Sequence, residues 1–421
     1  MKGNGLFNKD NFWATLFIFS ALIAISLAPI KSSIINPIED VFEEVDLTDL
    51  VFSQLRNEPA NDPHVVLVNV GNLNRAGIAE QIQIINQFEP KTIGVDVFFS
   101  TKNNSDSDSL LISTLSKVKN LVMISKPLKF NSETQEYDSI KTSDLKFLNN
   151  CAVASSTLIT GAENQEDIKI CRTFNPVFPI KGQEDQLAFG LKLVHYYNKE
   201  AATKFLSRKN EVETINFRGN HGNKFYTLDV DDVFNYNFTP DLIKGKIIIF
   251  GFLGSYIGDP SWEDKFFTPL NSKYIGRANP DMFGMEIHAN VISMILNEDY
   301  IDVVPEWFGI ILAVVVCFLN VAFFSLIYRK KELYYTILTK PIQFIEVVLL
   351  LGIVILLFHY LSLKIDLSLM LITILLVGDM LELYYNYIRH TVTTLRQKLL
   401  LKINLLKNNG KLDIILSRNR K

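Results

Sequence analysis

Residues 241–304 read DLIKGKIIIFGFLGSYIGDPSWEDKFFTPLNSKYIGRANPDMFGMEIHANVISMILNEDYIDVV, and they contain the most informative pattern in the sequence. Its short apolar run, Ile247 to Phe250, is typical of a strand that is buried on both faces. A polar loop with three glycines follows, at Gly251, Gly254 and Gly258. The segment after Gly284 is apolar to about Leu296 and predicts a helix.

Outside this stretch, the sequence contains long apolar runs, each about long enough to cross a bilayer. Buried helices of soluble proteins would show a polar face, and these runs largely do not. The sequence therefore predicts four transmembrane helices, at 12–30, 306–328, 341–361 and 365–388. The first run is expected to be a retained anchor. A cleaved signal peptide is the alternative, because Ser26-Leu27-Ala28 has a small-x-small pattern, but Pro29 opposes cleavage there.

Positive charge indicates which side of the membrane each segment faces. Arg329, Lys330, Lys331 and Lys340 lie between the second and third runs, and further Lys and Arg residues follow the fourth. The topology prediction is a cytoplasmic N-terminus at 1–11, an extracytoplasmic domain at 31–304 and a cytoplasmic tail at 389–421. The expected location is the inner membrane of a bacterium, with several passes through it.

The first half of the extracytoplasmic domain shows alternating strand and helix patterns. Residues 65–70 and 92–98 are predicted strands, and 76–88 is a predicted helix with its apolar residues on one face. A strand, helix and strand of these lengths form a parallel unit with a right-handed crossover. The predicted fold is an α/β domain with a mainly parallel sheet flanked by helices, followed by membrane helices.

Several pieces of this pattern occur together in one known family. In residues 241–304 they are the GK-apolar-G strand, the GD of Gly258-Asp259, the F-TPL of 267–270 and the G-EIHAN that begins at Gly284. Earlier in the chain they are HVVLVNV at 64–70, TIGVDVFF at 92–99 and NFRGN at 216–220. Their order resembles the CHASE domain of type 2, a bacterial extracytoplasmic sensory domain, over about residues 31–304. One departure is IKICR at 168–172, where only the arginine of the family's pattern is kept.

The resemblance implies a sensory function. Members of the family commonly continue into a cyclase, a histidine kinase or a protein kinase, whereas this sequence has only a short tail after its last membrane helix. We therefore expect the output to come from a separate cytoplasmic effector.

A ligand is expected where the predicted strands end, because glycines after a parallel strand open a crevice there. Asp96, Asp259 and Arg218 could converge on a polar ligand at this edge. The full candidate set is Asp96, Arg218, Gly251, Gly254, Asp259, Thr268 and His288. The alternative for Asp96 is structural, as a cap or as the partner of Arg218.

The sequence shows no motif for catalysis or for a bound metal. Acidic residues near Asp259 and Asp281 lack the spacing of a metal site, and Gly254-Ser255 is no nucleophile elbow. The polar run 101–109 fits a solvated loop and helix cap, or else a cation site. The expectation is a protein that is no enzyme, with no cofactor and no metal. A net charge of −3 gives no reason to expect nucleic-acid binding.

Two cysteines, Cys151 and Cys171, lie in the predicted extracytoplasmic domain, an oxidising compartment. They are expected on neighbouring antiparallel strands, where a disulfide would stabilise the fold by about 3 kcal/mol. Two buried free thiols are the alternative.

The last membrane run carries Asp379 and Glu382 near its inner end. They either reach the interface or form hydrogen bonds between helices in an oligomer. The tail places Leu395, Leu399, Ile403 and Leu406 on one face of a basic helix. Such a helix forms a coiled coil between protomers or lies on an anionic bilayer surface.

Two functions fit these observations. The first is a receptor subunit whose periplasmic domain binds an unknown signal and transmits it through the membrane helices to a separate partner. The second is a structural or adaptor subunit of a cell-envelope complex, which uses the periplasmic domain as a docking surface. Both predict association with the membrane and with a second copy or other envelope proteins.

Overall fold

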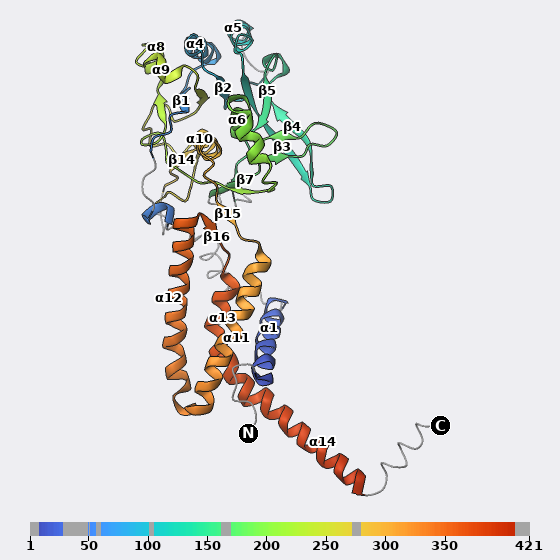
Figure 1. The fold of residues 1–421 in the computed structure, drawn as a ribbon. Helices are drawn as coiled ribbons and strands as arrows, with labels where there is room; N and C mark the ends of the chain where they lie inside the picture. Colours follow the sequence, from blue (N-terminus) through green and yellow to red (C-terminus); the bar gives the residue numbers. More distant parts are fainter. Residues whose placement is uncertain are drawn as a thin grey trace, which may run out of the picture. The chain divides into compact units, whose positions relative to one another are not determined.

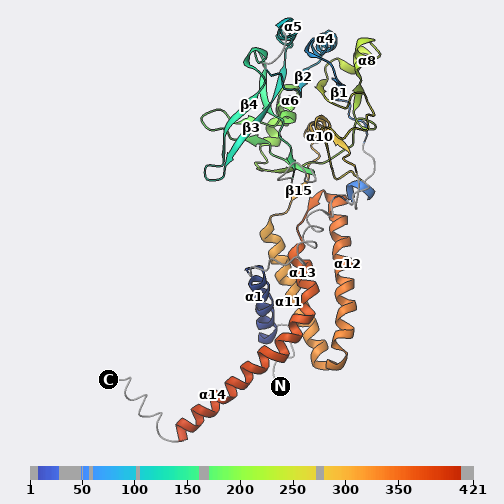
Figure 2. The ribbon, with the colours of Figure 1, turned by 180° about the vertical axis from the view of Figure 1, so that it is seen from behind.

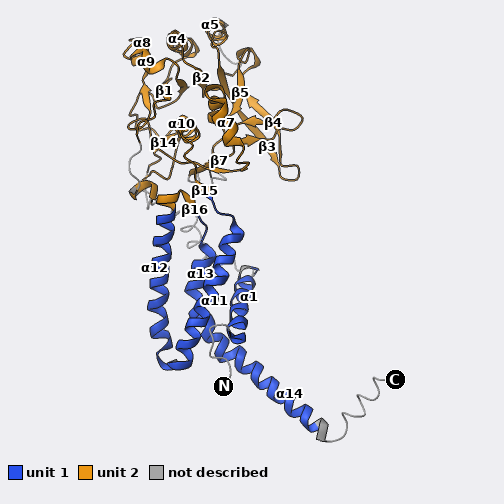
Figure 3. Cartoon of the chain, in the orientation of Figure 1, with its two compact units in different colours: residues 1–43, 303–357, 364–421 blue, residues 44–302, 358–363 orange. Residues whose placement is uncertain are grey.

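The computed structural model describes residues 8–27, 49, 51–55, 60–100, 105–160, 170–271 and 279–408. The chain divides into two compact units (Figure 3). Unit 1 comprises residues 1–43, 303–357 and 364–421, and unit 2 comprises residues 44–302 and 358–363. The signal-peptide alternative depends partly on residues 28–30, which lie outside the described residues.

Unit 2 is an α/β domain whose strands and helices can be followed in Figures 1 and 2. Its helices are α4 (Arg75–Asn86), α5 (Ser105–Leu115), α6 (Phe189–Tyr197), α7 (Lys199–Leu206), α8 (Val230–Phe234), α9 (Pro240–Ile243) and α10 (Gly284–Leu296). The strands of its main sheet are β1 (Val65–Asn69), β2 (Thr92–Val95), β3 (Leu121–Asn131), β4 (Glu136–Thr142), β5 (Ala152–Ser155), β11 (Tyr226–Leu228) and β12 (Ile247–Gly251). Its shorter strands are β6 (Ile159–Thr160), β7 (Cys171–Phe174), β8 (Val177–Phe178), β9 (Gln186–Leu187), β10 (Glu213–Thr214), β13 (Lys265–Phe266) and β14 (Met282–Phe283), and β15 (Asp302–Val303) and β16 (Leu363–Lys364) fall where the two units divide.

The main sheet has the order β11-β1-β12-β2-β3-β4, with β5 also paired to β3. All pairs are parallel except β3 with β4. β12, the strand near the start of residues 241–304, lies between β1 and β2 and is therefore a central strand. All five of its residues are buried, as its continuous apolar run predicts. The predicted fold class is confirmed.

Helices cover both faces of this sheet. Ile82 and Ile85 of α4, Leu111 of α5 and Val233 of α8 pack in one apolar core with β1, β2 and β12. On the other face, α6 contacts β2, β3 and β5, and α10 contacts β1 and β12. α6 approaches closely, because a Cβ at Gly94 of β2 would lie 2.7 Å from Phe189 Cζ. The layering positions α10 directly against the strand ends described below.

Tertiary contacts rather than a strong local pattern decide three segments of unit 2. Residues 136–142 form β4, which pairs with β3 in a hairpin. Residues 216–220 form no strand, since the neighbouring β10 ends at Thr214. The helix α6 begins at Phe189, after the short strand β9.

Unit 1 consists mainly of long helices, which are apolar except for the last. They are α1 (Lys9–Leu27), α11 (Glu306–Lys330), α12 (Tyr335–Leu361, of which Tyr335–Leu357 belong to this unit), α13 (Ser368–Leu383) and α14 (His390–Asn408). Among the described residues, three helical segments are long and apolar enough to cross a membrane: Glu306–Lys330, Tyr335–Leu361 and Ser368–Leu405. The first predicted span, 12–30, corresponds to α1, which is not among these three segments, and its crossing of the membrane stays a prediction.

Within unit 1 the helices are joined by polar as well as apolar contacts. Ala14 and Ile18 of α1 pack in one core with Cys317 of α11 and Val377 of α13. The Gln343 amide donates to the carbonyl oxygens of Ile374 (2.6 Å) and Leu375 (3.0 Å). Asp379 pairs with Lys340 at 2.7 Å, so this carboxylate is used between α12 and α13 of one chain.

Candidate functional site

The carboxyl ends of β1, β12 and β2 meet at one edge of the sheet. Asn69 ends β1 and is in register with Gly251, which ends β12. Asp96 follows β2, and its backbone N–H donates to the Phe250 oxygen at 2.7 Å. The structure therefore brings two of the candidate residues, Asp96 and Gly251, side by side where open α/β sheets bind ligands.

Asp96 is the most unusual ionisable group at this edge. Burial, and then the negative charge of Asp264, raise the pKa of its carboxyl from 3.8 to about 7. Among the described residues, no Lys, Arg or His lies within 4.0 Å of this carboxylate. A cation or a hydrogen-bond donor that reached this edge would relieve the cost of charging it.

Gly251 connects this edge to α10. A Cβ at Gly251 would lie 2.7 Å from Met285 Sδ and 3.4 Å from Asp96 Cβ. Glycine is therefore needed for close approach here, because any side chain would push Met285 away. Gly251 thus lies between Asp96 and Met285, which is in the first turn of α10.

The loop after β12 is held by Asn69, a residue that the sequence analysis did not single out. The Asn69 side-chain oxygen accepts from the N–H groups of Gly71 (3.0 Å) and Leu253 (2.9 Å). Its amide nitrogen donates to Asp229 Oδ1 (2.9 Å) and to the Gly254 oxygen (3.1 Å). A polar residue at the end of the otherwise apolar run VVLVN was the signal that could have revealed it.

Gly254 and Asp259, two of the candidate residues, are used within the same loop. Gly254 has φ +96°, and a Cβ there would lie 2.6 Å from Asp259 Cβ. The Asp259 carboxylate accepts from the N–H groups of Ser255 and Ser261, both at 2.9 Å. These two backbone hydrogen bonds, from Ser261 and then Ser255, lower the pKa of Asp259. Asp259 therefore shapes the loop.

Arg218 does not join Asp96 or Asp259, so the expected convergence of these three groups is corrected. Its guanidinium pairs with Asp299 at 3.1 Å, and its backbone N–H donates to Asn290 Oδ1 at 2.6 Å. The alternative that Arg218 is the partner of Asp96 is wrong for the same reason. The NFRGN segment is instead held against α10, because the Asn290 side chain accepts from the N–H of Gly219 (3.2 Å) and donates to the Gly219 oxygen (2.9 Å).

Glu286 is the centre of that contact. Its side chain is fully buried. Oε1 accepts from the backbone N–H of His221 (2.6 Å) and contacts His221 Nδ1 (2.8 Å), and Oε2 accepts from the Phe283 N–H (2.8 Å). The hydrogen bond from Glu286 raises the pKa of His221, although burial opposes it. Glu286 thus ties the loop that contains His221 to the start of α10.

The two remaining candidates have structural surroundings. Burial lowers the pKa of His288 to about 4, and its ring lies edge-on to Phe189 with centroids 5.2 Å apart. Thr268 donates to Asp281 from its backbone (2.9 Å) and from its hydroxyl (2.6 Å). Both side chains are buried, and their partners in these contacts are Phe189 and Asp281.

The predicted disulfide is wrong. Cys151 immediately precedes β5, which is parallel to β3 in the main sheet, whereas Cys171 is in β7 of a separate three-stranded sheet. All three cysteines are free thiols. Burial raises the pKa of Cys151 to about 11 and of Cys171 to about 12, which makes both poor nucleophiles. The sequence also predicts a turn at 161–164 between the strands of the two cysteines, and these residues lie outside the described part of the chain.

Reducing agent should therefore leave the stability of the protein unchanged. Loss of a native disulfide typically costs about 2–5 kcal/mol, so a real one would be obvious. The measurement is the melting temperature of the purified protein with and without dithiothreitol, together with a thiol titration after denaturation. Equal melting temperatures and three titrated thiols are expected. A single thiol would contradict the assignment.

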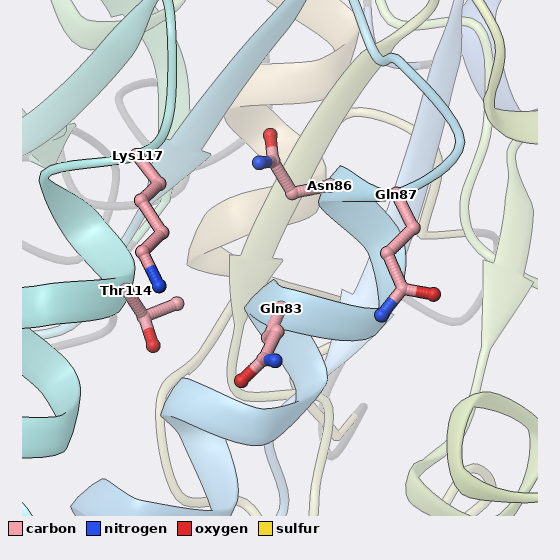
Figure 4. A pocket seen from close by; sticks show the side chains of 5 residues that line it. All are labelled: Gln83, Asn86, Gln87, Thr114 and Lys117. Atoms are coloured by element: carbon pink, nitrogen blue, oxygen red, sulfur yellow. The ribbon is translucent and has the colours of Figure 1, made fainter.

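A shallow hollow between α4 and α5 lies elsewhere on unit 2. Figure 4 shows the side chains that line it: Gln83, Asn86, Gln87, Thr114 and Lys117. They come from the last turns of α4 and α5 and from the residues just after them, which lead into the amino ends of β2 and β3. The hollow is therefore at the edge of the sheet opposite to Asp96.

Among the described residues, no group of three or more His, Cys, Asp and Glu side chains is placed so that it could hold a metal ion. The cation site considered for residues 101–109 falls partly outside the described residues, since 101–104 are not described. Ser105 to Ser109 belong to α5, in which Asp108 pairs with Arg75 and Lys146.

Comparison with known proteins identifies a family. A family model described as "CHASE2 domain" matches residues 35–322, more than half of the chain of 421 residues. No curated protein matches the sequence, and no solved structure does.

Proposed function

Because this chain belongs to the CHASE2 domain family, whose members are extracellular sensory domains, we propose that it is the receptor subunit of a bacterial signalling system. Its sensory domain binds a signal on the outer side of the inner membrane. Its membrane helices transmit the change to a separate cytoplasmic effector. The protein acts by binding, and we assign it no catalytic residue and no cofactor.

The arrangement around Asp96 carries this proposal. A ligand that favours the ionised carboxylate adds a cation or a donor beside Asp96, and Gly251 and Met285 lie directly behind it. Met285 is in the first turn of α10, and the chain continues from Leu296 through β15 into α11 at Glu306. A signal that binds two states of this edge differently shifts the population of the two states. The candidate ligand is therefore cationic or rich in hydrogen-bond donors.

One observation favours the adaptor function as a second candidate. The loop between β12 and β13 exposes Tyr256 (57%) and Trp262 (61%). Asp229 and Asp259 hold this loop through backbone hydrogen bonds, so the two aromatic side chains are presented by an ordered segment. Exposed Trp and Tyr residues on ordered loops are typical anchors of protein interfaces.

Crosslinking in native membranes, with mass spectrometry of the captured proteins, distinguishes the two functions. The forms compared are the full chain, a chain truncated after Tyr387 and Asp96→Asn. A receptor predicts a cytoplasmic effector that is captured by the full chain, lost on truncation and changed in yield by Asp96→Asn. An adaptor predicts the same envelope proteins in all three, and their loss in Tyr256→Ser/Trp262→Ser. Identical capture by all forms, with no cytoplasmic protein, contradicts the receptor.

The raised pKa of Asp96 makes a separate prediction about pH. The folded protein holds a proton that the unfolded chain releases, because the folded pKa is about 7 and the ordinary value is 3.8. Stability contributed by this group is therefore lost as the pH rises from about 4 to about 7. The melting temperature of Asp96→Asn should fall less over this range than that of the wild type. Parallel curves would show that Asp96 titrates normally. Other groups that titrate there, such as Asp281, are present in both proteins and cancel.

A further inference from the structure

We infer that α14 is a membrane-surface helix that binds anionic lipid headgroups with its apolar face towards the bilayer. The inference concerns unit 1 alone and holds whatever signal unit 2 binds. It is carried by the exposure of α14, by the position of its charges and by its place after the last membrane helix.

The apolar face of α14 is not covered by any part of the chain that the structure describes. Val392, Leu395, Leu399 and Ile403 follow one another at intervals of three or four residues and share one face of the helix. Their exposed fractions are 58%, 60%, 62% and 36%. Figures 1 and 2 show α14 leaving the bundle of unit 1 without another helix beside it. Such a continuous apolar face marks an interaction surface.

The charges of α14 border this face and have one sign. With about 100° between successive residues, Arg396 lies on one border and Lys398 and Lys402 lie on the other. Residues 390–408 contain no Asp and no Glu. Long basic side chains at the borders of an apolar face extend towards headgroups while their stems remain on the apolar side.

This charge pattern decides between a bilayer and a second copy of the helix. Two copies packed face to face would bring the basic borders together, without acidic residues in α14 to alternate with them. An anionic bilayer surface offers the opposite charge and covers the apolar face at the same time. The bilayer is therefore the occupant that the residues favour.

The position of α14 in the chain places it at the interface. The helical segment Ser368–Leu405 has 38 residues, whereas about 20 cross the hydrocarbon core. Tyr384–Arg389, between α13 and α14, is a π-helical turn, a common place for a helix to change direction. Arg389 in this turn pairs with Asp10 at 2.8 Å, before the start of the apolar part of α1. α14 thus begins where the hydrocarbon ends.

The test measures the depth of single spin labels on the full chain in bilayer nanodiscs. Cys151, Cys171 and Cys317 are replaced by serine or alanine, and a nitroxide is attached at Leu399→Cys or at Gln397→Cys, on opposite faces. With phosphatidylglycerol in the bilayer, the label at 399 should be accessible to oxygen and protected from a water-soluble nickel complex. The label at 397 should show the reverse. In pure phosphatidylcholine, or at high salt, the protection at 399 should be largely lost.

Charge variants separate the contribution of the basic borders from that of the apolar face. Lys398→Glu/Lys402→Glu should expose the label at 399 to the nickel complex even with anionic lipid, whereas Lys398→Arg/Lys402→Arg should behave like the parent. Two results overturn the inference. One is equal exposure of the label at 399 in both lipids. The other is spin–spin broadening between two copies that does not depend on the lipid, which would identify a coiled coil.

Discussion

Glu286→Ala should destabilise the sensory domain by about 3–5 kcal/mol, the largest effect that we expect from a single substitution. The carboxylate is fully buried and holds the backbone N–H groups of His221 and Phe283. Its removal leaves two donors without an acceptor and opens a cavity. Each unsatisfied buried donor costs about 1–3 kcal/mol, and the cavity adds to this.

Structure should be lost first around His221 and only then in the whole domain. His221 and Gly219 lie in a segment held to α10 by Glu286 and by Asn290, whose amide donates to the Gly219 oxygen at 2.9 Å. Without Glu286, amides of residues 218–224 should exchange with solvent faster than those of β12.

Thermal unfolding of the full chain in detergent, with hydrogen exchange read by mass spectrometry, measures both effects. Glu80→Ala is the matched control, because Glu80 is an exposed position of α4. Such surface changes usually stay within about 0.5 kcal/mol. If Glu286→Ala and Glu80→Ala have the same melting temperature, Glu286 does not hold the segment that contains His221 against α10.

Asn69→Ala is the second large effect, with an expected cost of about 2–4 kcal/mol. The side chain joins three loops, since it contacts Gly71, Leu253, Gly254 and Asp229. Alanine removes four hydrogen bonds, and each is worth about 0.5–1.5 kcal/mol net. The expected cost is in the lower part of their sum, because four bonds made by one side chain are not additive.

The glycine loop should respond most. Amides of Leu253 and Ile257 should lose protection in Asn69→Ala, because Asp229 also loses the amide that orients it towards Ile257. Asn86→Ala is the control, since Asn86 ends α4 at the distant hollow and alanine suits a helix. Unchanged exchange at 253–257 in Asn69→Ala would show that the loop is ordered without this side chain.

The same loop explains why the candidate site was only partly predictable. Gly251, Gly254 and Asp259 were expected in one loop because they are close in sequence, and they are. Asp96 was expected beside them because parallel strands end at one edge, and it lies next to Gly251. Arg218 was expected at the same edge, but it pairs with Asp299, a partner 81 residues away in sequence.

The cysteines show the same limit. Cys151 and Cys171 are 20 residues apart, and a loop of that length allows either a shared sheet or two separate ones. Only the pairing of β5 with β3, and of β7 with β6 and β10, decided against a disulfide. Asn69 and Glu286 likewise have partners more than 60 residues away in sequence, so their roles could not be inferred from local spacing.

The amino-acid sequence was sufficient to predict the strands β1, β2 and β12, the helices α4 and α10, the apolar membrane helices and the family. These follow from the period of apolar residues and from the order of short motifs, which are local properties of the chain. The pairing of polar groups could be seen only in the folded structure: Glu286 meets His221, Arg218 meets Asp299, and Asp96 has no cation beside it among the described residues. A buried polar group needs a hydrogen-bond partner, and that partner can come from any part of the chain that the fold brings close. The spacing of neighbouring residues in the sequence therefore does not identify it.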